Sequence, residues 1–595
     1  QQHDRSTVNV GTALRSGVRV LLDRPASVLP VYLLVAGVTA TARVPVVVGL
    51  AAVVGLLAAD GRLDALLSEL EAIDPQALDE SSPEATAESL PPGLEDALLD
   101  VFSPEIALLI AGAVLASAVV SVLANGIGNA AAINGIYGCL YGGDGVEDAV
   151  VGVGRDWQVF VGITLAKLGV LFVGSLPVVL GASLFVVSPV AGAAATLLGL
   201  LLSGIVVLVG LLLLAFVGQS VVVDGTTLGG AIRQSVGFPF REPIAVLAYV
   251  LVALAVFGGL GISGGLFSLL GVSQLSGILG PLFVFPFLDA FKTALYADRP
   301  LSATDDTDRT SSASGTLATD GGDRSPSDDR RTDTTEASTD EQPTADADQP
   351  ADADGRPMDA DGRPPQAGPG ADTSPRPAAD RLSDGVARPA DGDDRPPYRS
   401  RFVGAFRDGL VALGGFTRHH PVPILAAAAL FVAAAVGGWQ LTAAYAVDLP
   451  ASAEPGAVFG RFPVAVFVMI AANNWLVSAT AIYGGVALGV PTALDMLLNG
   501  FLVGAVSGIA DPIVVAALVA PHGVIELPAI VIAGGLGFHL AAVVAGVFRG
   551  TRTPTDLAAA LRLAYRVLLG LAVVLVVASF VEAFLTPVIA EAVLT

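Results

Sequence analysis

Uninterrupted apolar runs of about 20 residues limit the fold of this chain more than any other feature. The run at 104–124, PEIALLIAGAVLASAVVSVLA, carries one charged side chain, that of Glu105. A helix of about 20 apolar residues crosses a hydrocarbon core about 30 Å thick, and in lipid the backbone must satisfy its own hydrogen bonds. The chain is 53% hydrophobic. We therefore predict an all-α polytopic integral membrane protein with about 11 transmembrane helices in two bundles.

A polar segment at 298–400 separates the apolar runs into two groups. It is rich in Asp, Thr, Ser, Pro and Gly, and residues 301–400 hold 23 Asp and Glu against 11 Arg. Such a segment buries too little apolar surface to offset its chain entropy, so we predict a disordered acidic linker. It would join a six-span membrane module at 1–297 to a five-span module at 401–595.

Three similar units in the N-terminal module predict three helical hairpins. Residues 10–37, 146–174 and 228–259 each begin with a short amphipathic stretch, pass a polar or proline break and end in a long apolar run. We expect an interfacial helix before each hairpin. Arg43 interrupts the first apolar run, 28–59, and the pattern leaves open whether this run forms one span or two.

The number and type of charged residues argue against nucleic-acid binding and indicate a salt-adapted host. Residues 60–103 hold 12 Asp and Glu against one Arg and would form an outer acidic loop, while lysine is confined to Lys167 and Lys292. Acidic polar segments with scarce lysine indicate a salt-adapted, halophilic host. The net charge of −24 argues against binding to nucleic acid, which needs basic patches. The lone Cys139 excludes an internal disulfide and a cysteine-based zinc cluster.

Basic residues before the spans predict the orientation in the cell membrane. They precede each hairpin and the first C-terminal span, and they also lie between the last two spans: Arg15, Arg19, Arg24, Arg155, Arg233, Arg241, Arg401, Arg407, Arg418, Arg549, Arg552, Arg562 and Arg566. Cytoplasmic loops carry an excess of Lys and Arg. A multi-pass protein is therefore expected with its N-terminus and linker in the cytoplasm and its C-terminus outside.

The stretch LVAPHGVIELPAIVIAGG, residues 518–535, is the most unusual part of the C-terminal module. The five spans are predicted near 422–446, 463–489, 494–519, 524–548 and 563–587. His522 would then lie in a loop near the outer face, and Pro521 and Pro528 would give the fourth span a re-entrant or kinked start. On a helix, His522 and Glu526 share one face because they are four residues apart.

His522 and Glu526 are open to three interpretations. They could be metal ligands, perhaps with His539. They could form a proton-accepting or substrate-binding pair, since ionisable residues within membrane segments are functional candidates. They could also form a structural lock, in which imidazole and carboxylate bond to each other and to the interrupted backbone. The H-x-x-x-E spacing alone does not choose between them.

Other polar side chains in the same module extend this hypothesis. These further candidates are Asn473, Asn474, Asn499, Glu582 and Thr586. We predict that Asn473, His522, Glu526 and Glu582 converge on one polar site near the outer boundary. The alternative is a set of separate hydrogen bonds between helices, each worth about 0.6 kcal/mol.

Gly500, Gly504 and Gly508 follow the G-x-x-x-G spacing. Such a smooth ridge lets a second helix approach closely. Tight packing within the module is the favoured interpretation, and dimerisation is the alternative.

The string PHGVIELPA, preceded by the pair Asn473–Asn474 and followed by EAFLTP from Glu582, carries a family resemblance. Over about 401–595, the chain resembles the stage II sporulation protein M family of integral membrane proteins. Further matching positions are Gly485, Gly489, Asn499, Gly500, Gly504, Gly534, Gly535, Thr586 and Pro587. In endospore formers, such proteins are similar to membrane scaffolds that hold peptidoglycan-degrading partners. The N-terminal module resembles uncharacterised six-span domains of archaeal-type membrane proteins.

These observations predict a non-enzymatic integral membrane scaffold that recruits partner proteins at the cell envelope, with 60–103 and the linker as contact surfaces. Its partners would be the lipid bilayer and membrane or envelope proteins, and the oligomeric state is open. The alternative is a transporter or channel component with a polar site at His522, Glu526 and Glu582. A membrane metalloenzyme is a third possibility. No P-loop, nucleophile elbow or S-x-x-K arrangement supports an enzyme, so we predict no catalytic residues, cofactor or metal.

Overall fold

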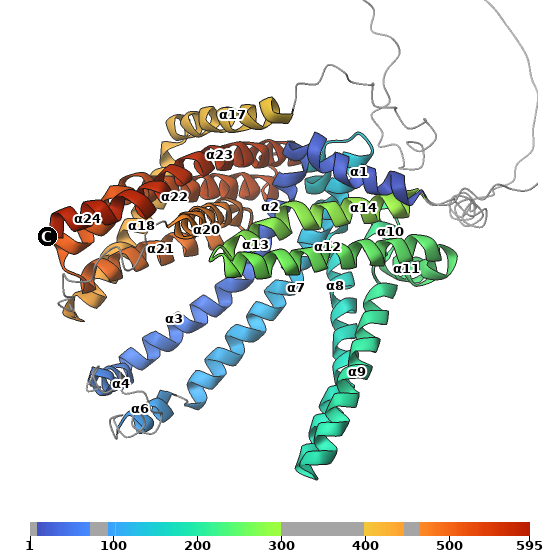
Figure 1. Ribbon diagram of the computed structural model, residues 1–595, viewed down its shortest axis with the longest axis horizontal. Coiled ribbons are helices and arrows are strands. Elements are labelled where there is room, and N and C mark those ends of the chain that lie inside the picture. The colour runs from blue at the N-terminus through green and yellow to red at the C-terminus, as the bar shows by residue number, and fades with distance from the viewer. Residues whose placement is uncertain (1–8, 72–92, 102, 299–397, 446–462, 595) are drawn as a thin grey trace, which may run out of the picture. The chain divides into compact units, whose positions relative to one another are not determined.

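The computed structural model describes residues 9–71, 93–101, 103–298, 398–445 and 463–594. Within these ranges the chain is helical and contains no strand, and 11 helical segments are long and apolar enough to cross a membrane (Figure 1). The predicted all-α polytopic fold is thus confirmed. The predicted disorder of the linker concerns residues 299–397, which lie outside the described ranges, as do 72–92 and 102 of the acidic loop.

The first span is one interrupted helix, which answers the question that Arg43 left open. Helix α2 (Pro25–Ala40) continues through the 3-10 turn η1 (Thr41–Arg43) into α3 (Val44–Ala59). Pro45, in the first turn of α3, has no backbone N–H to donate to the carbonyl of Thr41, and this missing bond falls at the tightened turn.

Three spans begin in the same way, with a helix, one residue outside the helical region and a proline. Helices α1 (Val10–Asp23), α11 (Leu228–Arg241) and α17 (Tyr398–His419) are followed by Arg24, Glu242 and His420. These three residues have φ of −130°, −128° and −126°, with ψ of 45°, 62° and 55°. The residue before a proline avoids the helical region, and proline suits the first position of a helix.

The second predicted unit does not share this layout. Residues 146–174 lie within one continuous helix, α8 (Gly145–Ser183), so the expected break is absent there. The reason is local, because its first proline, Pro177, comes well after the expected break.

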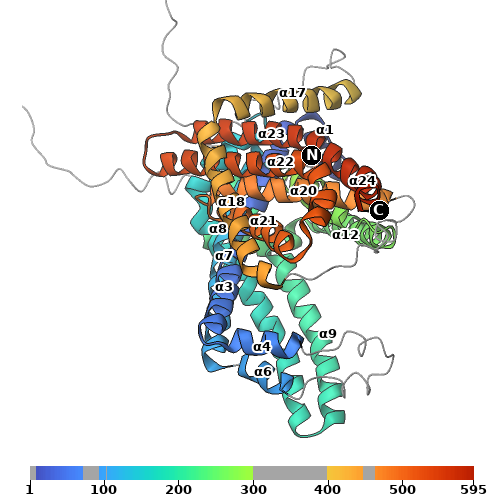
Figure 2. The same ribbon diagram turned by 90° about the vertical axis from the view of Figure 1, so that its left-hand side faces the viewer.

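The N-terminal helices form long hairpins with exposed apolar faces. Helix α7 (Pro104–Leu140) runs beside α3, and α8 runs beside α9 (Pro189–Leu213), to which the 3-10 turn η3 (Leu184–Val186) leads (Figures 1 and 2). The acidic helices α4 (Arg62–Glu71) and α6 (Leu94–Val101) contact each other beyond the end of α3 (Figure 2). In a bilayer, apolar surface of this kind faces lipid or other membrane helices.

The remaining N-terminal helices complete the fold of residues 9–298. They are α10 (Val217–Asp224), α12 (Pro243–Leu269), α13 (Gln274–Leu279), the π-helical turn η4 (Gly280–Val284) and α14 (Phe285–Ala297). Helix α14 packs against α1, where Gly17 faces the backbone of Phe291 at 3.3 Å from the position a Cβ would take. This approach brings the amphipathic α1 onto the last helix of the module.

The C-terminal helices form a bundle around α22 and α23. The bundle contains α18 (Pro421–Thr442), η5 (Ala443–Tyr445), α20 (Val464–Tyr483), η6 (Gly484–Val486), α21 (Val490–Ile509), α22 (Pro512–Phe548), α23 (Pro554–Phe580), the π-helical turn η7 (Val581–Leu585) and α24 (Thr586–Leu594). Helix α22 has 37 residues and a length of about 55 Å.

The predicted boundary between the third and fourth C-terminal spans is wrong. It was expected near Pro521, but α21 ends at Ile509, and α22 begins at Pro512 and runs through both Pro521 and Pro528. Asp511 fixes the actual start, because its carboxylate accepts a 2.7 Å hydrogen bond from the N–H of Ile513. His522 therefore lies in a helix rather than in a loop, and no re-entrant start occurs.

The glycine ridge of α21 packs within the bundle, as favoured from its spacing. A Cβ at Gly500 would collide with the carbonyl of Phe431, and one at Gly504 with the carbonyl of Ala435, both in α18. Gly508 lies equally close to the side chain of Thr442. This ridge is therefore occupied by α18, which removes it as a free surface for dimerisation.

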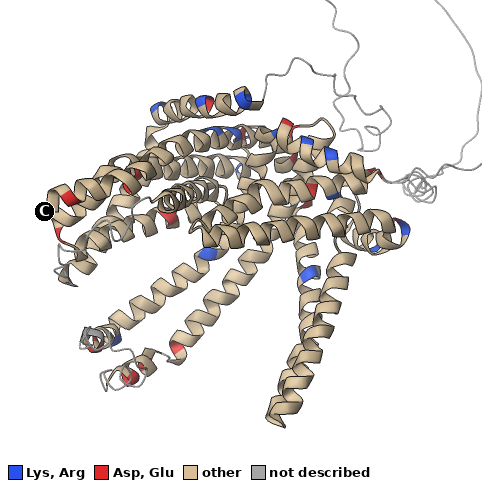
Figure 3. Ribbon diagram, in the orientation of Figure 1, with Lys and Arg blue, Asp and Glu red and all other residues tan. Residues whose placement is uncertain are grey.

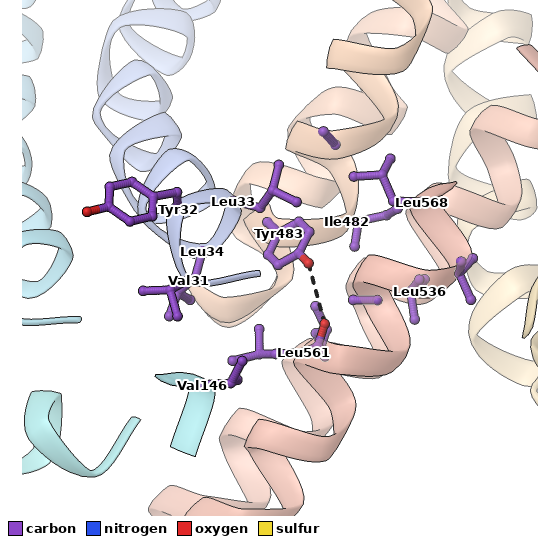
Figure 4. Packing of buried hydrophobic residues seen from close by; sticks show 14 of the residues in the cluster. Val31, Tyr32, Leu33, Leu34, Val146, Ile482, Tyr483, Leu536, Leu561 and Leu568 are labelled. Carbon is purple, nitrogen blue, oxygen red and sulfur yellow. Dashed lines mark hydrogen bonds between the residues drawn. The ribbon is translucent and has the colours of Figure 1, made fainter. Parts of the chain in front are cut away.

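Helices from both ends of the described chain share one hydrophobic core. Tyr483 of α20 is fully buried beside Val31 of α2 and Leu561 of α23, and its hydroxyl donates to the Leu561 carbonyl at 3.4 Å (Figure 4). Gly37 of α2 lies so close to the backbone of Tyr483 that a Cβ there would collide with it. The six-span and five-span groups are thus packed together.

Polar contacts reinforce this junction. Arg562 of α23 forms an ion pair with Asp144, which also caps α8, and Thr555 donates to Glu147 at 3.1 Å. Burial raises the pKa of the Asp144 carboxyl, but the hydrogen bond and charge of Arg562 outweigh it and lower that pKa below its usual value. The Arg401 guanidinium donates to the Asp23 carbonyl at 2.9 Å.

Candidate functional site

Three ionisable side chains of the C-terminal bundle meet between α22 and η7. His522 and Glu526 come from α22, and Glu582 comes from η7. One nitrogen of the imidazole and one oxygen of each carboxylate all lie within 4.8 Å of one another. The structure thus brings together three of the four residues expected to converge.

Helix α22 presents the first two residues of this cluster on one face. A separation of four residues puts His522 and Glu526 about 6 Å apart along the helix axis. Pro521 and Pro528 flank them inside the helix and remove two backbone donors. The Glu526 atom Oε2 is buried and has no hydrogen-bond partner within the described part of the chain. Burying a carboxylate oxygen without a hydrogen-bond donor costs free energy, because the charged carboxylate has lost its hydration.

The π-helical turn η7 supplies the third side chain. It spans Val581–Leu585, and the Thr586 hydroxyl donates to the Val581 carbonyl at 3.2 Å. Turns of this type occur often at functional sites because they reorient side chains inside a helix. Thr586 Oγ1 also lies 3.5 Å from Nδ1 of His522, so the same residue contacts both sides of the cluster.

Aromatic rings hold η7 on the side away from α22. Phe580 and Phe584 have ring centroids 4.9 Å apart, and both rings contact Phe467 of α20, at 6.4 and 6.0 Å. Each lies two residues from Glu582, so a helical arrangement directs the phenylalanines and the glutamate to opposite faces. The apolar face thus anchors the turn, while the carboxylate faces α22.

The predicted asparagines make their hydrogen bonds elsewhere. Asn473 donates to the side chain of its neighbour Asn474 at 3.3 Å, and Asn499 donates to the Asp495 carbonyl in its own helix at 2.8 Å. These bonds lie within α20 and α21 and do not link the asparagines to the cluster. The expected role of Asn473 in the polar site therefore has no hydrogen bond to support it.

His539 lies far from His522 and next to another histidine. Seventeen residues of α22 separate the two, which corresponds to about 25 Å along the helix. The rings of His539 and His420 have centroids 4.5 Å apart, and Phe416 stacks on His420 at 4.8 Å. A metal site combining His539 with His522 and Glu526 is thus excluded by distance.

Two buried polar residues were not among the site residues predicted from the sequence. His420, beside His539, has a buried Nδ1 without a hydrogen-bond partner among the described residues. Asp495 carries a similarly unpartnered carboxylate oxygen, Oδ2, inside α21. A lone carboxylate in the run VPTALDMLLNG is a recognisable signal, since ionisable residues are rare within membrane helices.

The cluster has no ion-paired basic partner in the part of the chain that the structure describes. Among the described residues, no Lys or Arg forms an ion pair with Glu526 or Glu582. Basic positions recur along α17 and α1, acidic ones gather on α4 and α6, and long stretches of α3, α7, α8 and α9 are uncharged (Figure 3). Two carboxylates and an imidazole without a basic counter-charge can take up a proton or a cation.

Comparison with known proteins places this cluster inside a recognised region. Residues 426–587 match the family model described as Stage II sporulation protein M, and all of the cluster falls within this range. The chain is also 30% identical over 138 residues to an uncharacterized protein of Methanocaldococcus jannaschii, a match that covers 22% of this chain and 75% of that protein. No solved structure matches the chain.

Proposed function

From the premise that this chain belongs to the stage II sporulation protein M family, we propose that it is a non-enzymatic membrane scaffold that gathers partner proteins at the cell envelope. The observation that carries the proposal is an uncovered glycine face on α12. Gly258, Gly261 and Gly265 fall within about 60° on one side of the helix, and nothing lies within 4 Å of the position of a Cβ at any of them.

The contrast with α21 explains why this face supports a scaffold. Gly500 and Gly504 have the same kind of smooth surface, but α18 already occupies it. Small residues let membrane helices approach closely, and association in lipid depends on such packing rather than on hydrophobicity. A partner's transmembrane helix is the ligand that this face of α12 would accept, in addition to the contact surfaces proposed at 60–103 and in the linker.

Cross-linking in native membranes tests the scaffold. The wild-type chain should recover partners in fixed stoichiometry, and a Gly258→Leu/Gly265→Leu variant should lose them by at least ten-fold. Gly204→Leu is the matched control, because Gly204 of α9 also has open space around it and stands outside the glycine face. A wild-type protein recovered as a clean monomer without partners would refute the scaffold.

The distribution of charge supports the proposed orientation. Basic residues occur on α1, α17 and the turn that connects α22 to α23, whereas α4 and α6 carry acidic residues at the other end of the first span (Figure 3). Under the positive-inside bias the basic side faces the cytoplasm. In a Cys139→Ser background, a cysteine at Thr551 should react only from the cytoplasm and one at Glu95 only from outside. The reverse labelling would invert the topology.

A transporter or channel component is the second candidate, and the convergence of His522, Glu526 and Glu582 favours it. Ionisable groups that face one another inside a bundle mark many proton and ion pathways. Reconstituted vesicles should then show proton or solute flux that Glu526→Gln abolishes and Glu591→Gln, on the exposed face of α24, leaves intact. Flux that is unchanged in Glu526→Gln would eliminate this candidate.

A further inference from the structure

We propose that His522, Glu526 and Glu582 form a binding site for one divalent transition-metal ion, which joins η7 and α24 to α22. The cluster combines one imidazole with two carboxylates, and its ligand atoms already lie within 4.8 Å of one another. The inference does not depend on the scaffold, because a protein can gather partners without binding metal and can bind metal without gathering partners.

The chemistry of the three side chains selects the class of ion. An imidazole nitrogen suits zinc, iron, copper and nickel, and carboxylate oxygens also bind zinc and manganese. Mg²⁺ and Ca²⁺ prefer sites made of oxygen alone, so the histidine disfavours both. Three protein ligands leave one position open on a four-coordinate ion. We therefore use Zn²⁺ as the probe and Mg²⁺ as the ion that should not compete.

The observed spacing lies close to that of a bound site. Ligand atoms about 2.1 Å from one tetrahedral ion are about 3.4 Å from each other. Closing the cluster from 4.8 Å to that spacing requires the side chains to move by about 1 to 2 Å. Rotation about the side-chain bonds of Glu526 and Glu582 supplies this movement, and the helices can keep their positions.

In the proposed site, the contact with Thr586 selects which nitrogen of the His522 imidazole binds the ion. Its single hydroxyl proton is committed to the Val581 carbonyl at 3.2 Å. Towards Nδ1 of His522, 3.5 Å away, the hydroxyl oxygen can then only accept. Nδ1 thus carries the ring proton, and the lone pair of Nε2 is free to bind the ion. A hydrogen bond to the second ring nitrogen orients most metal-binding histidines in this way.

Burial gives the cluster a reason to hold a cation. Glu526 Oε2 is inaccessible to solvent and has no hydrogen-bond partner within the described residues. No Lys or Arg in that part of the chain pairs with either carboxylate. Two carboxylates brought together in a region of low dielectric repel each other, and a doubly charged ion balances both.

Metal titration of the full chain tests the site. The protein, purified without a histidine tag and stripped with a chelator in lipid nanodiscs, should bind one equivalent of Zn²⁺ in the presence of excess Mg²⁺. His522→Gln, Glu526→Gln and Glu582→Gln should each weaken binding at least 100-fold, and Thr586→Val about ten-fold. His419→Gln and Glu591→Gln are the matched controls and should bind Zn²⁺ as the wild type does, because both side chains are exposed outside the cluster.

Two results would overturn the proposal. The first is a wild-type protein that retains less than a tenth of an equivalent of Zn²⁺ at micromolar concentration. The second is equal affinity in the wild type and in Glu526→Gln/Glu582→Gln. If the variants do not fold, X-ray absorption of the Zn²⁺-loaded wild type decides: one imidazole among oxygen ligands supports the site, and a shell with several imidazoles or none refutes it.

Discussion

Helix α22 is about as apolar as α8 and less apolar than α9, yet a much larger share of it is buried than of either. In the most apolar 18-residue stretch of the span formed by α22, 56% of residues are buried, compared with 11% and 17% in the spans that contain α8 and α9. Hydropathy therefore does not decide which helices form the core. Where lipid and protein interior are equally apolar, close fit between helix surfaces decides. Glycines of α21 and α22 fit against several helices of the bundle, whereas Gly181 of α8 and Gly199 of α9 fit only against the other helix of their hairpin.

The largest effect on stability is expected when a packed glycine is replaced, and replacing an open glycine provides the comparison. Gly504→Leu should disrupt the bundle, with a loss of unfolding free energy of more than about 3 kcal/mol, because the new side chain would collide with the Ala435 carbonyl. Gly204→Leu on α9 should change it by less than about 0.5 kcal/mol. Thermal unfolding in nanodiscs measures both. Equal losses would show that the open face of α9 tolerates an added side chain no better than the packed face of α21.

A smaller loss of unfolding free energy is expected when the Tyr483 ring is removed from the junction between the six-span and five-span groups. Tyr483→Ala opens a cavity beside Val31 and Leu561 and should cost about 2 to 4 kcal/mol. Leu208→Ala, on the exposed face of α9, removes a side chain that is 70% exposed and should be close to neutral. A neutral Tyr483→Ala would mean that the two groups do not depend on this contact.

The smallest expected effect concerns the Arg562–Asp144 ion pair and its pH dependence. Because the folded-state pKa of Asp144 is lowered, the pair stabilises the fold above the unfolded-state pKa near 3.8, and this contribution is lost as the pH falls further through the folded-state value. Asp144→Asn should therefore reduce stability at pH 7 and converge with the wild type well below pH 4. If the stability difference between Asp144→Asn and the wild type stayed constant across this pH range, titration of Asp144 would not be its cause.

Local residue patterns predicted the helices whose start is set by a proline and whose extent is set by the length of an apolar run. Pro25, Pro243 and Pro421 mark the starts of three spans, and each follows a residue that proline keeps out of the helical region. The same reasoning misplaced the start of α22 at Pro521. Prolines inside a membrane helix persist where neighbouring helices support the bend, and a local pattern does not contain those neighbours.

The sequence predicted which residues belong to the candidate site better than it predicted how they come together. His522 and Glu526 share a helical face by spacing alone, but Glu582 lies 56 residues beyond Glu526, and its approach depends on how α23 and η7 pack against α22. The π-helical turn that directs Glu582 toward α22 has no simple sequence signal. Asn473 was assigned to the same site by depth, although its hydrogen bond joins it to Asn474 instead.

The sequence by itself determined the all-α membrane class and the approximate number of spans, because a bilayer about 30 Å thick demands apolar helices about 20 residues long. Only the tertiary structure decided which helices form the core, that Tyr483 joins the two groups, and that Glu582 meets His522. These outcomes depend on which side of each helix faces which neighbour. Shape complementarity sets that choice, and helices of equal hydropathy can differ in it completely.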